Sequence, residues 1–133
     1  MSTPKRILLI DHEPHLTAMV GSALEASGQY LIQKEDYSPG VLDIALHFQP
    51  DLILLDAEPQ HLEIDEVAQR IHADRALHDV PVVCLTSLAQ NGQIGSIGFL
   101  GGYTFVANPF HLDDMVRCIA EILAEKRARR VSA

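Results

Sequence analysis

Five short runs of apolar residues limit the folds open to this chain more than any other feature of its sequence. Most of the runs are unbroken rather than alternating, which is typical of parallel strands covered on both faces. The runs are Ile7–Ile10, Tyr30–Gln33, Leu52–Leu55, Val80–Leu85 and Tyr103–Ala107. The sequence therefore predicts a sheet of five buried, parallel strands.

Apolar residues at helical spacing lie between and after the runs. The sets are Leu16, Met19, Val20, Ala23 and Leu24; Val41, Leu42, Ala45 and Leu46; Ile64, Val67, Ala68 and Ile71; and Leu112, Met115, Val116, Ile119, Ile122 and Leu123. In the first helix, Pro14 lies near the start and Gly28 at the end, as is common. We expect an α/β fold, a doubly wound five-stranded parallel sheet in which each strand is followed by a helix.

The fourth interval, Leu88–Leu100, has the weakest helical pattern. It contains Gly92, Gly95 and Gly98, and each glycine costs roughly 0.8–1 kcal/mol relative to alanine inside a helix. Ile94 and Ile97 still give it some apolar face. We expect a frayed or mobile helix in this interval.

Length and charge restrict the classes of function. The 133 residues are enough for one domain, so we expect no effector domain. The net charge is −8, and residues 1–124 carry 6 basic against 17 acidic residues, a net of −11. An acidic body repels nucleic acid and anionic membranes, which argues for a cation or a protein as its partner.

The lack of a recognisable targeting signal and the placement of the cysteines favour a cytoplasmic protein. No run is long enough to span a membrane, and the first six residues lack the apolar core of a signal peptide. Cys84 and Cys118 lie inside apolar patterns, so we expect buried, reduced thiols in a cytoplasmic protein.

Polar residues follow the strands at the edge where a doubly wound sheet carries its site. Asp11 follows the first run, Asp56 the third, Thr86 the fourth and Asn108 the fifth. Asp11 and Asp56 should face each other across neighbouring strand ends, where a cation such as Mg²⁺ would neutralise them. The alternative is that each aspartate only caps the helix that follows it.

Four segments resemble the receiver domain of response regulators, with its CheY-like fold. They are Ile7–Pro14, with its Asp-His-Glu-Pro ending; Gln49–Asp56; Val80–Ser87; and Asn108-Pro109-Phe110. The intervals between the key residues match the family without net insertion, and the resemblance covers about residues 5–124. We therefore expect a receiver domain over residues 1–124 and a basic C-terminal tail over 125–133.

The resemblance implies a phosphorelay function. Asp56 would take a phosphoryl group from a histidine kinase or phosphotransfer protein. Mg²⁺ would be held by Asp11, Asp56 and the backbone carbonyl of Glu58. Thr86 and Phe105 would be the switch residues. Positioning and charge neutralisation suffice for this chemistry, so a dedicated enzyme is not expected.

The resemblance also implies where the signal leaves the domain. The fourth helix, fifth strand and fifth helix would form the face for a partner or for a homodimer. The basic tail is the solvated continuation of the last helix or the beginning of a connection to an output module.

Several residues depart from the family pattern. His12 replaces a second acidic residue, and imidazole is a poor ligand for magnesium. Asn108 replaces the lysine on the phosphate side, a loss of order 1.5–3 kcal/mol of charge-assisted contact. The loop after Asp56 is rearranged, with Pro59 and Gln60 in place of Met-Pro, and Phe105 lacks a tyrosine hydroxyl.

These departures leave other interpretations open. The chain could be a degenerate pseudo-receiver that binds its partner without phosphorylation. A small phosphohydrolase would use Asp56 as nucleophile and Glu58 as general acid. His12, His61 and His111 follow strand ends and could form a transition-metal site or a pH switch, although scattered histidines are usually solvated.

Overall fold

A computed structural model describes residues 4–11, 14–56, 62–85, 95–96, 104–107 and 112–132. The strands are β1 (Lys5–Asp11), β2 (Tyr30–Asp36), β3 (Leu52–Asp56), β4 (Val82–Leu85), β5 (Gly95–Ser96) and β6 (Thr104–Ala107). The helices are α1 (Pro14–Ala26), α2 (Val41–Phe48), α3 (Leu62–Ala73) and α4 (Leu112–Ser132). Among these residues no helix is both long enough and apolar enough to cross a membrane.

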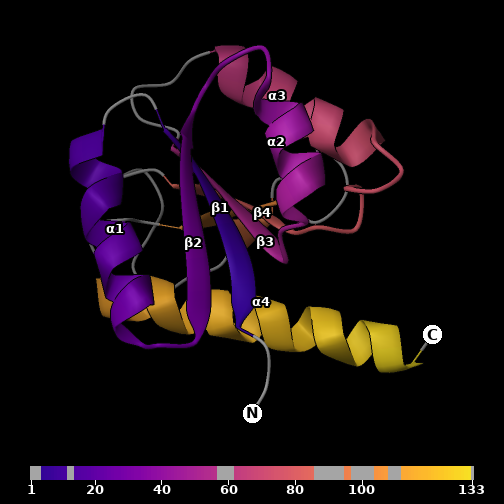
Figure 1. Ribbon diagram of the computed structural model, residues 1–133. Coiled ribbons are helices and arrows are strands. Elements are labelled where there is room, and N and C mark those ends of the chain that lie inside the picture. Colours follow the sequence, from indigo (N-terminus) through magenta and orange to yellow (C-terminus); the bar gives the residue numbers. More distant parts are fainter. Residues whose placement is uncertain are drawn as a thin grey trace.

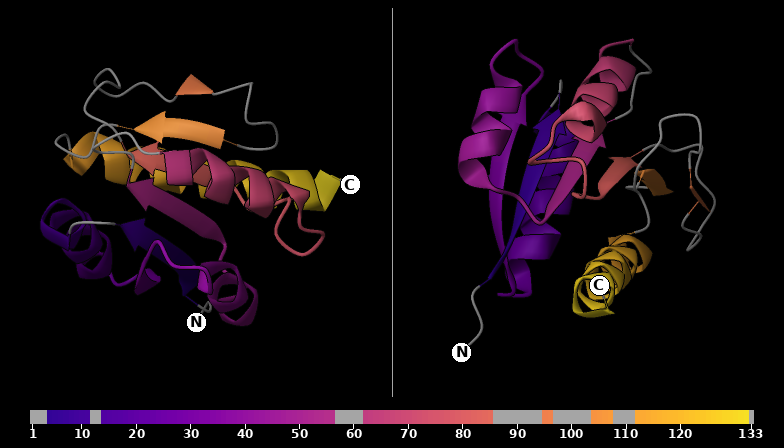
Figure 2. Two further views of the ribbon diagram at one scale, coloured as in Figure 1. Left: turned by 90° about the horizontal axis from the view of Figure 1, so that it is seen from above. Right: turned by 90° about the vertical axis from the view of Figure 1, so that its right-hand side faces the viewer.

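The sheet has the order β2-β1-β3-β4-β6-β5, and all neighbours are parallel except β5 and β6. Helices α1 and α4 cover one face, and α2 and α3 cover the other (Figures 1 and 2). Strand β2 pairs with one edge of β1, and β3, the next strand along the chain, pairs with the other edge of β1. This reversal of strand order confirms the doubly wound α/β fold and places a switch point between β1 and β3.

Alternate residues of the central strands fill two separate cores. Leu8, Ile10, Ile53 and Leu55 pack under α2 and α3. Ile7, Leu9, Leu52 and Leu54 pack under α1 and α4. Both faces of β1, β3 and β4 are therefore buried, which is why these strands are unbroken apolar runs in the sequence.

The edge strand β2 is longer than the sequence predicts. The apolar run ends at Gln33, but the strand continues through Lys34 and Glu35 to Asp36. β2 is half exposed along its length, so polar residues are tolerated there and an apolar run does not mark its end. The prediction that β4 begins at Val80 was also wrong, because Val80 and Pro81 precede the strand.

Residues 95–96 correct the prediction of a helix over 88–100, and they add a short antiparallel edge strand to the predicted parallel sheet. Gly95 and Ser96 form the short strand β5, which pairs antiparallel with Val106 and Phe105 of β6. The other residues of that interval lie outside the described residues. Glycine at 95 disfavours a helix, and the pairing with β6 gives its backbone another partner.

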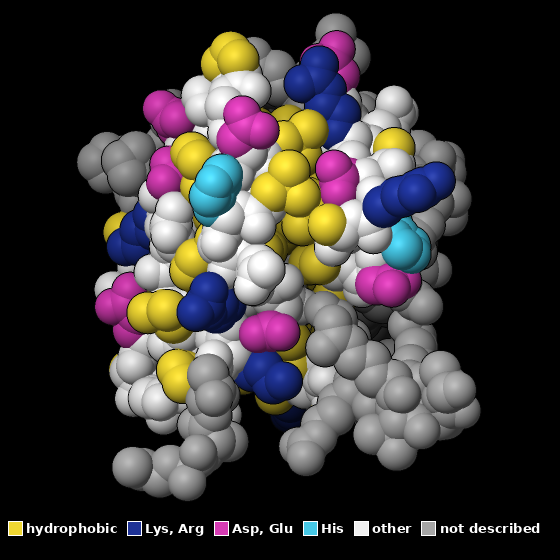
Figure 3. Space-filling model, turned by 45° about the vertical axis from the view of Figure 1, so that its right-hand side comes forward, with side chains coloured by type: hydrophobic (Ala, Val, Ile, Leu, Met, Phe, Trp, Pro, Cys, Tyr) yellow, Lys and Arg dark blue, Asp and Glu magenta, His cyan; other side chains and the backbone are white. Residues whose placement is uncertain are grey.

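The helical stripes are confirmed in most positions. Val20 and Leu24 of α1 are buried, but Met19 is 54% exposed and does not belong to the core face. In α2, Val41 and Ala45 are buried, while Leu46 is 37% exposed. Figure 3 views the side that carries α2 and α3, where hydrophobic side chains show between charged groups. The last helix continues through most of the predicted basic tail, to Ser132.

Candidate functional site

Two aspartates end neighbouring strands at the carboxyl edge of the sheet. The last paired residues of β1 and β3 are Ile10 and Leu55, and Asp11 and Asp56 are the next residues of the two strands. Adjacent strands lie about 4.8 Å apart. The structure thus brings these residues together, as the sequence predicts.

Both aspartates are removed from solvent. Asp11 is 9% exposed and Asp56 is 1% exposed. Side chains alternate along a strand, so Asp11 falls on the side of Ile7 and Leu9, and Asp56 on the side of Leu52 and Leu54. This is the face covered by α1 and α4, so the two carboxylates belong to one site.

The donor set fits a hard divalent cation. Two buried carboxylates on neighbouring strands repel each other unless nearby groups compensate their charge. Carboxylate oxygens suit Mg²⁺, which usually binds one or two of them and keeps several waters. Within the described segments, no group of three His, Cys, Asp or Glu side chains is arranged to hold a metal. Within the described residues, Asp11 and Asp56 are thus two carboxylates that could ligate such an ion.

A tyrosine that the sequence does not single out also reaches this edge. The hydroxyl of Tyr37 donates a hydrogen bond to the backbone carbonyl of Asp56, at 3.1 Å. Asp36, the residue before it, ends β2 and pairs in register with Asp11. Pro39-Gly40 is the sequence signal that could have indicated Asp36 and Tyr37. This turn pair allows β2 to extend beyond the end of its apolar run.

Several expected site residues lie outside the described residues. They are His12, Glu58, Thr86 and Asn108, together with His61 and His111 of the alternative metal site. Phe105 is part of β6, where its backbone pairs with Val83, but its side chain is not described. The described part of the site is thus Asp11, Asp56 and Tyr37, with Asp36 beside them.

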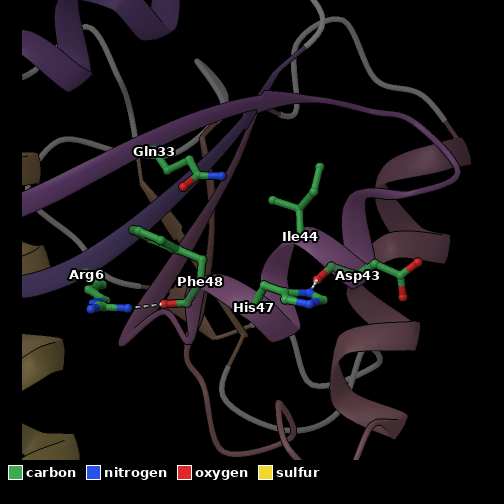
Figure 4. A pocket seen from close by; sticks show the side chains of 6 residues that line it. All are labelled: Arg6, Gln33, Asp43, Ile44, His47 and Phe48. Atoms are coloured by element: carbon green, nitrogen blue, oxygen red, sulfur yellow. Dashed lines mark hydrogen bonds between the residues drawn. The ribbon is translucent and has the colours of Figure 1, made fainter.

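A separate pocket of about 390 Å³ lies near the amino end of β1, away from the two aspartates. Its lining residues come from β1, β2 and α2 and are drawn in Figure 4: Arg6, Gln33, Asp43, Ile44, His47 and Phe48. The guanidinium of Arg6 donates to the carbonyl of Phe48 at 2.8 Å. His47 Nδ1 lies 2.8 Å from the carbonyl of Asp43. The pocket is open, and both of these contacts are made to backbone carbonyls of α2.

Known proteins similar to this chain are regulators. No family model matches the chain. The DNA-binding dual master transcriptional regulator RpaA of Synechocystis is 34% identical over 119 residues, which are 89% of this chain and 48% of RpaA. The polar-differentiation response regulator DivK of Brucella anthropi is 25% identical over 122 residues, which are 92% of this chain and 98% of DivK. The chain thus spans about half the length of RpaA and nearly all of DivK.

Solved structures share the fold. A response regulator of Chloroflexus aurantiacus matches with a TM-score of 0.73 and 22% identity, over 92% of this chain and 99% of that one. The receiver domain of a sensor histidine kinase of Pseudomonas aeruginosa matches with a TM-score of 0.70 and 21% identity, over 92% and 99% of the two chains, and holds a magnesium ion in its active-site cleft. The relatives named above are response regulators, and the fold is that of their receiver domains. The chain therefore resembles the CheY-like receiver domains of response regulators in both sequence and fold.

Proposed function

We propose that this chain accepts a phosphoryl group on Asp56 from a histidine kinase or a phosphotransfer protein. The observation that carries the proposal is the burial of Asp56, 1% exposed, at the carboxyl end of β3 and one register step beyond the Ile10–Leu55 pair. A carboxylate held there beside Asp11 is a fixed nucleophile at the switch point of the sheet.

The chemistry needs little beyond positioning. An oxygen of the Asp56 carboxylate forms a bond to phosphorus while the bond from phosphorus to the histidine nitrogen of the donor breaks, and that nitrogen keeps the electron pair. Asp11, Asp56 and the carbonyl of Glu58 would hold Mg²⁺, which when bound supplies charge neutralisation for the phosphoryl oxygens. The role of Asp11 is to keep a hard oxygen ligand beside the nucleophile.

The remaining roles follow from chain order and from the family. Thr86 comes directly after β4, whose last residue Leu85 pairs with Asp56. Thr86 would serve as the switch hydroxyl and Phe105 as the aromatic switch residue. Asn108 stands where the family has lysine, so the site would hold the phosphoryl group with one positive charge fewer.

Output would pass through residues 88–107 and α4, the family's face for partners or homodimers. The chain would thus be a signalling protein that catalyses only its own phosphoryl transfer. We also propose a cytoplasmic location, because Cys84 and Cys118 are buried free thiols, as in proteins of reducing compartments.

A second candidate function is a pseudo-receiver that binds its partner without phosphorylation. His12 and Asn108 favour it, because each replaces a charged residue that the family uses to bind the metal or the phosphate. Under this proposal Asp11 and Asp56 would have only a structural role.

One experiment separates the two. The protein is incubated with acetyl phosphate and Mg²⁺, and its intact mass is measured over time. Gain of one phosphoryl group, lost in Asp56→Asn and kept in the control Asp43→Asn, supports phosphorylation; Asp43 is exposed in the first turn of α2. An unchanged mass with acetyl phosphate and with a phosphorylated histidine donor would favour the pseudo-receiver.

A further inference from the structure

The side chain of Tyr37 bridges two strand ends. Figure 1 shows the chain passing from β2 to α2 at the end of the sheet where β1 and β3 also finish. Tyr37 is the first residue of that connection, and its hydroxyl lies 3.1 Å from the carbonyl oxygen of Asp56. The ring is partly buried and packs against the core under α2 and α3. Packing on one side and a hydrogen bond at the tip hold the phenol in one orientation.

The acceptor is the peptide group that orients the nucleophile. Asp56 is the last residue of β3, so its carbonyl belongs to the peptide bond that leads out of the strand. The orientation of this peptide sets the backbone angle ψ of Asp56 and the direction in which residue 57 departs. The Tyr37 hydrogen bond therefore acts on the backbone on which the Asp56 carboxylate is carried.

The burial of Asp56, whose carbonyl accepts the bond, makes this hydrogen bond effective. Asp56 is 1% exposed, and hydrogen bonds shielded from water are electrostatically stronger than exposed ones. Phosphoryl transfer requires the attacking oxygen close to phosphorus and in line with the leaving group. A small rotation of the Asp56 peptide would misplace that oxygen relative to Asp11.

We infer that Tyr37 is a positioning residue for phosphoryl transfer to Asp56: its hydroxyl fixes the last peptide of β3, and so the direction of the nucleophile, without touching the phosphoryl group. This inference rests on the proposed function. It adds a residue from the β2–α2 connection to a site whose two described carboxylates lie at the ends of β1 and β3.

The first test compares two identical substitutions. Tyr37→Phe removes the hydroxyl and keeps the packed ring. Tyr30→Phe is the matched control, because Tyr30 is also a half-buried tyrosine, at the start of β2, and packs against the other core. The initial rate of phosphorylation by acetyl phosphate and Mg²⁺ is measured for both, together with the midpoint of thermal unfolding.

We expect Tyr37→Phe to slow phosphorylation by about two- to tenfold, as the loss of one hydrogen bond predicts, and Tyr30→Phe to keep the wild-type rate. A wild-type rate in Tyr37→Phe would overturn the inference while leaving the proposed function intact. Absence of phosphorylation in the wild-type protein would overturn both.

A spectroscopic test adds a signal that ring packing alone would not give. The chain has three tyrosines and no tryptophan, so its tyrosine emission is free of tryptophan. Beryllofluoride and Mg²⁺, which mimic the phosphorylated state, should change this emission in the wild type and in Tyr30→Phe. The change should be lost in Tyr37→Phe. A change of the same size in Tyr37→Phe would overturn the inference.

Discussion

Arg6 and Asp51 exchange two hydrogen bonds at the amino end of the sheet. The backbone N–H of Arg6 donates to Oδ2 of Asp51 at 2.8 Å, and the N–H of Asp51 donates to the carbonyl of Arg6 at 2.7 Å. The Arg6 guanidinium lies over the ring of Phe48, 5.6 Å from its centroid. These contacts tie the start of β1 to the end of α2 and to the residue before β3, so they fix the register of the two strands that carry Asp11 and Asp56.

We expect Asp51→Ala to lower the free energy of unfolding by about 1–2 kcal/mol, because it removes the acceptor of a partly buried, charge-assisted hydrogen bond. Asp51→Asn keeps an oxygen at that position and should lose less. Urea unfolding of the three proteins measures the difference. Equal stability of wild type and Asp51→Ala would contradict the assigned role.

Two glycines, one inside α1 and one just after it, should respond in opposite directions to alanine. Gly21 lies inside α1, and an added Cβ would meet Cε of Lys34 at 2.9 Å, which is the movable end of a flexible side chain. Because glycine costs roughly 0.8–1 kcal/mol in a helix interior, Gly21→Ala should raise the melting temperature. The gain will be smaller than the full propensity difference, since Lys34 must shift.

Gly28→Ala should lower the melting temperature. Gly28 has a φ of +72° just after α1, with open space around the position of a Cβ. The cost is therefore a backbone cost of about 1 kcal/mol, as for other residues forced into the left-handed region. Differential scanning fluorimetry of both variants checks the pair. A lower melting temperature for Gly21→Ala than for Gly28→Ala would refute this account.

His72 of α3 should make stability depend on pH below neutrality. Burial lowers the pKa of His72 from its ordinary value of 6.5, opposed by a hydrogen bond with the backbone of His78. The folded protein then binds a proton at this site less readily than the unfolded chain does. Stability should be unaffected by His72 above pH 6.5 and should fall as the pH drops from 6.5 toward the lowered folded-state value.

Urea titrations between pH 5 and pH 8 (roughly the range in which histidine titrates) test this expectation. His72→Gln should show a shallower loss of stability in acid than the wild type. His47→Gln, at an exposed position of α2, is the matched control and should follow the wild-type curve. Parallel curves for wild type and His72→Gln would show that His72 does not contribute to the loss of stability in acid.

Cys118 should react slowly with thiol reagents in the folded protein. Burial raises the pKa of its thiol, the carboxylates of Glu121 and Asp114 raise it further, and Arg117 opposes them. Since the thiolate is the reactive form, labelling with a disulfide reagent at pH 8 (about the ordinary thiol pKa) should be slow. In urea, the reagent should label the thiols of both Cys84 and Cys118 rapidly. Fast labelling without denaturant would mean that Cys118 is accessible.

Mg²⁺ should stabilise the protein through the two aspartates. A ligand that binds only the folded state raises stability with its occupancy, so the melting temperature should rise with Mg²⁺ concentration. Asp11→Asn removes one carboxylate from the site and should abolish most of the rise, while Asp43→Asn should keep it. An equal rise in all three proteins would place the magnesium elsewhere.

Most of the fold could be predicted from the sequence because burial on both faces gives β1, β3 and β4 continuous apolar runs. The same rule fails where burial is incomplete. It ends β2 at Gln33 instead of Asp36, and it assigns Met19 to the core although the side chain is 54% exposed. The antiparallel pairing of β5 depends on a neighbour in space and leaves no periodic signal in two residues.

The candidate site also contains residues that the sequence predicts and one that it does not. The position of Asp11 and Asp56 at the same edge of the sheet could be predicted, because aspartates at the ends of buried parallel strands gather there. Tyr37 could not, because its partner lies 19 residues away and depends on the path of the connection after β2. Residue types alone do not indicate which hydroxyl reaches which carbonyl.

The acceptor of the Tyr37 hydrogen bond is a main-chain oxygen, and every amino acid has one. The bond therefore does not distinguish aspartate from any other residue at position 56. A descendant of this chain could exchange its aspartate and still keep the tyrosine, the end of β3 and the connection after β2 in place. In such a lineage the local fold would be kept after phosphorylation at position 56 is lost, and the same surface could then evolve another function.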